Sequence, residues 1–136
     1  SFRSLREVVT EASQKGEEVL FIEQRHLVTL GMIENIPLVP EYEVVDLMEM
    51  AMSNNSYYLN AFHQDIREHR FGVIIVAPQF LELKGTDQPF FEESNTWIQH
   101  VSEYILCYYE PSLRLHPERI YAYVPKEQEE SCTFSK

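Results

Sequence analysis

Hydrophobic and polar positions repeat with two different periods along this chain, and each period predicts one kind of element. Where apolar residues recur every three or four positions, an amphipathic helix is expected. Gly16 and Gly31 stand where glycine commonly ends a helix, after the first two of these stretches. This period predicts helices over residues 2–12, 24–30, 43–52, 58–70 and 90–103, with residues 53–56 as a break that offers a new helix cap.

Short runs of β-favouring apolar residues predict the strands. The clearest run covers residues 71–77 and ends at Pro78, and another covers residues 19–22. Only a short strand is expected over residues 36–40, because the two prolines there each remove a hydrogen-bond donor. The last strands are expected to form a hairpin with arms at residues 104–110 and 120–124.

Strands that alternate with helices favour βαβ units, in which helices cover both faces of a mostly parallel sheet. The sequence therefore predicts an α/β fold, a Rossmann-like three-layer sandwich with a mostly parallel sheet and a C-terminal antiparallel hairpin. With 136 residues, the chain has the size of one domain. We expect this domain to cover residues 1–125 and the polar residues 126–136 to form a flexible tail.

The charge balance excludes some partners. Eleven Lys and Arg residues against 22 Asp and Glu residues give a net charge of -11. Such a surface repels phosphate backbones and anionic lipid head groups, so we expect neither a nucleic-acid partner nor attachment to anionic membranes. We interpret the acidity mainly as a contribution to solubility.

The chain has no apolar run that approaches the length needed to cross a bilayer, so we expect no direct membrane insertion by this segment. It has no recognisable signal peptide and opens with Ser1, which we interpret as the start of an excised domain or a processed chain. Cys107 lies in an apolar run and Cys132 in a polar tail, so no disulfide framework is predicted.

The patterns that accompany common chemistry are missing. The turn at residues 23–26 has no glycine that would let the backbone approach a phosphate, which argues against a dinucleotide site or a P-loop. The spacing of His63 and His69 does not suit a pair of metal ligands on one helix. No Ser or Cys stands in a nucleophile pattern. We expect no catalytic residue, no cofactor and no metal, and no turnover by the isolated domain.

One group of polar residues is a candidate ligand site. In open α/β sheets, ligands bind beyond the carboxyl ends of the strands. If residues 19–22 and 36–40 are neighbouring parallel strands, the side chains that follow them meet in a polar cleft suited to a sugar or a cation. The alternative is structural, with acids that favour the start of a helix. The candidate side chains are Glu23, Arg25, His26, Glu41, Tyr42 and Glu43.

Tyrosines concentrate around the expected hairpin. Aromatic cross-strand pairs stabilise hairpins, so we interpret these residues as packing. The alternative is a contact face for another domain or for a sugar. The residues are Tyr104, Tyr108, Tyr109, Tyr121 and Tyr123.

Several segments stand in an order that is typical of a known tail domain. They are residues 18–22 followed by Arg25, Leu27, Gly31 and Ile33, then residues 37–43, Asp65 and Ile66, residues 71–75, 108–110 and 120–125. In this order the chain resembles, over residues 17–125, the soluble C-terminal domain of multi-spanning membrane proteins of the dolichyl-phosphate-mannose–protein mannosyltransferase family, especially uncharacterised bacterial members.

In that family the catalytic acids lie in loops between membrane helices, so no catalytic residue carries over to this chain. The resemblance implies a non-catalytic accessory domain on the extracytoplasmic face of a membrane, with a role in acceptor recognition or assembly. Its partner would be the membrane-embedded part of the same protein. The alternative is a free-standing, cytoplasmic Rossmann-like domain that binds a small sugar, another polar ligand or a protein. The two hypotheses differ in whether apolar spans precede Ser1.

Overall fold

The computed structural model describes residues 2–34, 36–128 and 131–135. Its centre is a four-stranded sheet with the strand order β1-β2-β4-β3. The pair β1–β2 is parallel, whereas the pairs β2–β4 and β3–β4 are antiparallel. The strands are β1 (Glu18–Phe21), β2 (Phe71–Val76), β3 (Tyr109–Leu115) and β4 (Ile120–Pro125).

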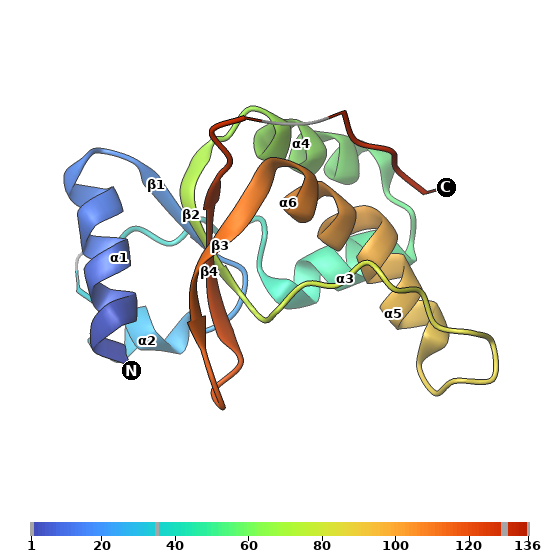
Figure 1. Cartoon of the computed structure of the whole chain (residues 1–136), viewed down its shortest axis with the longest axis horizontal. Helices are drawn as coiled ribbons and strands as arrows, with labels where there is room; N and C mark the ends of the chain where they lie inside the picture. Colours follow the sequence, from blue (N-terminus) through green and yellow to red (C-terminus); the bar gives the residue numbers. More distant parts are fainter. Residues whose placement is uncertain (1, 35, 129–130, 136) are drawn as a thin grey trace.

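Helices cover both faces of this sheet (Figure 1). On one face lie α1 (Phe2–Gln14) and α2 (His26–Thr29). On the other face lie α3 (Val44–Met52), α4 (Ser56–Arg67) and an uninterrupted helical segment. That segment consists of α5 (Phe91–Trp97), a π-helical turn (Ile98–Ser102) and α6 (Glu103–Tyr108).

The sheet separates two hydrophobic cores. Along β2, Val73 and Ile75 enter the core beneath α1 and α2, whereas Ile74 and Val76 enter the core beneath α3, α4 and α6. This alternation follows from the two-residue period of a strand. A strand buried on both faces has a continuous apolar sequence, which is why residues 71–77 were the clearest strand signal.

The predicted fold class is wrong, because the sheet has one parallel pair and two antiparallel pairs. The expected strand at residues 36–40 does not form. Its prolines, Pro37 and Pro40, cannot donate to a ladder, so the segment passes the sheet as irregular structure. The second edge of β2 is paired with β4, so the hairpin supplies half of the sheet and its other arm, β3, is an edge strand.

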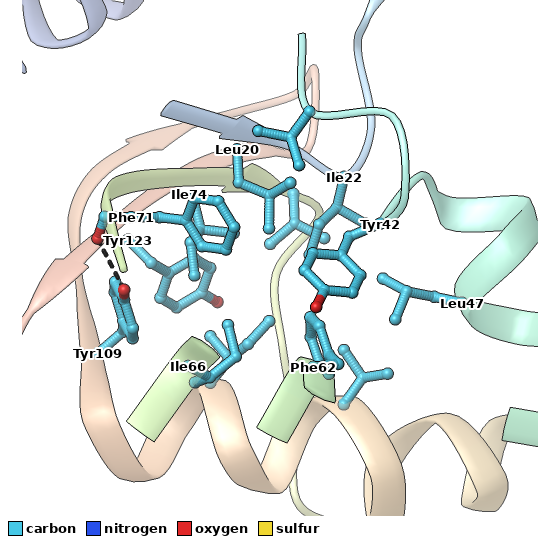
Figure 2. Close-up of a cluster of buried hydrophobic side chains, with 14 residues drawn as sticks. Leu20, Ile22, Tyr42, Leu47, Phe62, Ile66, Phe71, Ile74, Tyr109 and Tyr123 are labelled. Atoms are coloured by element: carbon cyan, nitrogen blue, oxygen red, sulfur yellow. Dashed lines mark hydrogen bonds between the residues drawn. The ribbon is translucent and has the colours of Figure 1, made fainter. Parts of the chain in front are cut away.

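The expected first arm of the hairpin is also displaced. Residues 104–108 continue the helix, since Val101 and Ile105 lie one helical turn apart and are both fully buried. The strand begins only at Tyr109, whose hydroxyl donates to the carbonyl oxygen of Phe71 at 2.7 Å (Figure 2). This buried bond fixes the point at which the helix gives way to β3.

The two cysteines form a disulfide, so the sequence-based expectation of no disulfide framework is wrong. Cys107 at the end of α6 is joined to Cys132, and their Cα atoms lie 6.0 Å apart. The pairing arises because residues 131–135 return to α6, a long-range approach that cysteine spacing does not show.

Among the described helices, none is long and apolar enough to cross a membrane.

Candidate functional site

The structure brings part of the predicted ligand cluster together at the carboxyl end of β1. The start of α3 is tied to this point by a hydrogen bond from the Val44 amide to the Ile22 carbonyl oxygen at 2.9 Å. Arg25 thereby lies within the electrostatic influence of Glu41 and Glu43, and also of Asp46 on α3. The sequence also predicted that these residues lie close together, but for a different reason. It assumed a parallel strand at residues 36–40, and that strand does not form.

Most members of the cluster have structural partners within the chain. A Glu23 carboxylate oxygen accepts a hydrogen bond from the Ala77 amide at 2.7 Å, which joins the ends of β1 and β2. The Glu43 carboxylate accepts from the Val45 amide at 3.0 Å and so caps α3. His26 is exposed at the first position of α2.

Tyr42 belongs to the core and not to an open cleft. Its ring is 3% exposed and packs edge-on against Phe62, with 5.0 Å between the ring centroids (Figure 2). Its hydroxyl donates to an Asp65 carboxylate oxygen at 2.7 Å. Burial, with the bond to Asp65 adding to it, raises the pKa of Tyr42. The phenol therefore stays protonated and acts as a fixed donor.

Arg70 organises the acids around Tyr42, and sequence reasoning missed it. Its guanidinium contacts Asp65 at 2.8 Å, Glu18 at 3.1 Å and Glu41 at 3.5 Å. The hydrogen bond to Glu18 and then that to Asp65 raise the pKa of Arg70 against the effect of desolvation. Because these three acids are more than 20 residues apart in the sequence, no local sequence pattern predicts the network. Within this network Glu41 has Arg70 as a structural partner.

Arg25 is the exception within the cluster. Its Nε donates to the Phe21 carbonyl oxygen at 2.8 Å, but its buried Nη2 has no hydrogen-bond partner among the described residues. Burial lowers the pKa of Arg25, and the charges of Glu43 and Asp46 oppose that effect. The side chain remains a cation held beside acids, with one donor group unsatisfied.

A hollowed surface, larger than the cluster around Arg25, lies on the outer side of α3. Two adjoining hollows, of about 570 and 670 Å³, share Met48 and together form what we call the apolar groove. The first hollow runs between α3, the segment after β2 and α5, and the second follows the exposed side of α3. Their lining includes Val44, Val45, Met48, Met52, Pro78, Phe80, Trp97 and Ile98.

The main polar groups at the floor of the apolar groove are paired within the chain. The Gln79 side-chain oxygen accepts from the Trp97 indole nitrogen at 3.0 Å and from the Ser102 hydroxyl at 2.6 Å. The Gln79 side-chain amide donates to the Ala77 carbonyl oxygen at 2.8 Å. A ligand in this groove therefore meets mainly apolar surface.

Exposed apolar side chains lie in the groove and in the loop before α5. Val45, in the lining of the groove, is 61% exposed, and Phe90, at the end of the loop, is 74% exposed. This loop projects away from the sheet (yellow in Figure 1). It is held at its base because Asn95 exchanges two hydrogen bonds of 2.8 Å with the backbone of Lys84. The other exposed apolar side chains of this region are Met52, Phe80, Leu81 and Leu83.

The tyrosines do not form the single hairpin face considered as an alternative. Tyr104 and Tyr108 lie on α6, outside the hairpin, while Tyr109 and Tyr123 are buried in the core beneath α3, α4 and α6. On the hairpin, Tyr121 is half-buried, and its ring centroid lies 6.0 Å from that of Tyr123.

Among the described residues, no group of three or more His, Cys, Asp or Glu side chains is placed to hold a metal ion. Comparisons of the chain with protein-family models, with curated proteins and with solved structures found no match.

Proposed function

We propose that this chain is a non-catalytic docking domain, and that its apolar groove binds a segment of another polypeptide with apolar and basic side chains. One observation carries the proposal. The groove and the loop before α5 leave large apolar side chains exposed, while the polar groups of Gln79, Trp97 and Ser102 are paired within the chain. Large contiguous apolar patches on soluble domains commonly mark interaction sites.

The charge of the domain selects the chemistry of the partner. The net charge is -11, and Glu49 and Glu82 line the two hollows beside the single basic side chain of Lys84. A partner segment that places Leu-like side chains in the groove and Lys or Arg at its edges complements both features. Such rim charges mainly speed association and select the partner, whereas the apolar contacts supply most of the affinity.

The resemblance to the mannosyltransferase family supplies a wider context for this proposal. In that context the docking partner is the membrane-embedded part of the same protein, and the domain serves assembly or acceptor recognition. The test is the gene itself. Apolar spans encoded before Ser1 would support this context, and a start codon shortly upstream without such spans would exclude it.

Docking is tested with a helical peptide that carries Leu on one face and Lys on the other. Its fluorescence anisotropy should rise on binding, and a peptide with Glu in place of Lys should bind much more weakly because the domain is acidic. Val45→Asp should weaken binding about tenfold, or about 1.4 kcal/mol, because it places a carboxylate in the groove.

Thr10→Asp is the matched control, since it adds the same charge at an exposed position of α1, on the opposite side of the sheet. Equal binding by both variants would mean that the peptide is attracted by net charge alone, and the groove proposal would fail.

A second candidate function is the binding of a small polar ligand at Arg25, and the unpaired Nη2 of that residue favours it. A thermal-shift screen with sugars, nucleotides and divalent cations tests it. A stabilising ligand should raise Tm for the original chain but not for Arg25→Lys, while Arg3→Lys on exposed α1 keeps the response. The absence of any shift in all three classes would count against the site.

A further inference from the structure

Residues 131–135, here called the C-terminal strap, lie against α6. The strap is joined to the end of this helix by the Cys107–Cys132 disulfide. Beyond the disulfide, the Ser135 amide donates to a Glu103 carboxylate oxygen at 2.8 Å, and the Ser135 hydroxyl donates to the other oxygen. Between these two points, the Phe134 ring lies parallel to the Tyr104 ring, with 4.2 Å between their centroids.

Phe134 completes a stack of three nearly parallel rings with Tyr104 in the middle. On the other side of the stack, the His63 ring of α4 lies 3.5 Å from Tyr104 between centroids, with 6° between the planes. His63 Nε2 is 2.8 Å from the carbonyl oxygen of His100, which anchors the stack to the π-helical turn. The strap thus covers an aromatic surface that otherwise faces outward from α6.

We propose that the C-terminal strap is a redox-released cover, held closed by the Cys107–Cys132 disulfide and opened by a dithiol reductant. On opening, the sulfur–sulfur bond breaks, each cysteine sulfur gains one electron and one proton, and the dithiol becomes a cyclic disulfide. Cys107 is 7% exposed and Cys132 is half-buried, so a reductant reaches the Cys132 sulfur more easily.

The physical reason for this dependence is the entropy of ordering a chain end. The contacts of Phe134 with Tyr104 and Tyr108 and the two hydrogen bonds from Ser135 to the half-buried Glu103 are weak compensation for fixing the backbone of the strap. The disulfide removes most of that cost, because it confines the strap beside α6 before the ring contact forms. The strap is therefore closed in an oxidising compartment and open where thiols are kept reduced.

The experiment follows the ring-proton resonances of Tyr104 by NMR in the whole chain. In the oxidised protein, the stacked Phe134 ring shifts these resonances upfield. Dithiothreitol should abolish that shift, and Cys132→Ser should abolish it without reductant. Phe134→Ala should also abolish it while peptide mapping still finds the disulfide. Thr133→Ala, at an exposed strap position, is the control and should keep the shift.

Two results would overturn the proposal. One is an unchanged Tyr104 shift in Cys132→Ser, which would mean that the stack holds Phe134 without the disulfide. The other is free thiols, or only intermolecular disulfides, in non-reduced protein purified from an oxidising compartment. Far-UV circular dichroism of each variant shows whether the helices remain folded. This proposal concerns α6 and does not rest on the docking function of the apolar groove, so either can fail alone.

Discussion

At the scale of single residues, this domain uses buried polar groups as fixed links between distant segments. The hydroxyl of Tyr42 and the guanidinium of Arg70 both bind Asp65, which ties the segment before α3 to the end of α4. Tyr109 plays a similar role where it meets the carbonyl of Phe71. Each link pairs a donor with an acceptor that burial would otherwise leave unsatisfied.

Tyr42→Phe tests the first of these links. The variant keeps the ring in the core but loses its bond to Asp65, whose carboxylate keeps Arg70 as a partner. We expect the free energy of unfolding in urea to fall by about 0.5–1.5 kcal/mol. Tyr57→Phe is the control, because Tyr57 is 89% exposed and its change should leave stability the same. Equal stability of the two variants would contradict a structural role for the Tyr42 hydroxyl.

His63 makes stability depend on pH. Burial lowers the pKa of His63 to about 4, against the opposing hydrogen bond to the carbonyl of His100. In the unfolded chain this imidazole titrates near its ordinary value of about 6.5. Between about pH 4 and pH 6.5 the unfolded chain binds a proton at His63 more readily than the folded chain does. The contribution of His63 to the free energy of unfolding is therefore highest above pH 6.5 and falls as the pH is lowered from 6.5 towards about 4.

The expected loss from His63 is about 2 kcal/mol between pH 7.5 and pH 5, measured by urea unfolding. Burial lowers the pKa of His100 too, which acts in the same direction. His63→Gln should therefore reduce the pH dependence without abolishing it. An NMR titration that gives His63 an ordinary pKa would contradict the argument.

At the scale of elements, helix starts are set by side chains that cap them. Glu43 accepts from the amide of Val45 at the start of α3, and Asn55 accepts from the amide of Tyr58 at the start of α4, each at 3.0 Å. Both bonds satisfy amides that have no partner within the helix. The capping role of Glu43 matches the structural alternative considered for this acid from the sequence.

Asn55→Ala tests the cap of α4. The variant loses the bond to the Tyr58 amide, and we expect the free energy of unfolding to fall by about 1 kcal/mol. Asn60→Ala is the matched control, since Asn60 is exposed within the same helix and alanine is the better helix former there. The capping assignment would be wrong if Asn55→Ala were no less stable than Asn60→Ala.

At the scale of the whole molecule, the acids of the candidate ligand cluster have structural partners within the chain. Glu41 is paired with Arg70, Glu23 bonds the Ala77 amide, and Glu43 caps α3. An acid–base catalyst needs a carboxylate that is free to exchange a proton with a substrate. The partners of these three acids are one reason why we propose binding and not catalysis for this chain.

We accordingly expect no turnover of activated sugar donors or aryl glycosides above the buffer rate. The measurement is release of nucleotide or of the aryl group by the purified chain. A reproducible rate that Glu41→Gln or Glu43→Gln abolishes would contradict this expectation. Glu7→Gln on α1 serves as the control for the effect of losing one exposed acid.

The sequence by itself determined the elements whose signals are local. The helix periods around α1, α3 and α4 and the apolar runs of β1 and β2 are confirmed, because side-chain periodicity is dictated by the geometry of each element alone. It also placed Arg25 and Glu43 near each other, although the reason offered was wrong.

Only the tertiary structure decided which elements are neighbours. Residues 36–40 add no parallel strand, and β4 pairs antiparallel with β2, so the expected parallel sheet is a mixed one. The Arg70 network, the disulfide and the apolar groove each join segments far apart in the chain. Such contacts depend on how whole layers of helices and strands pack together. The residue pattern within one segment does not specify which other segment will pack against it.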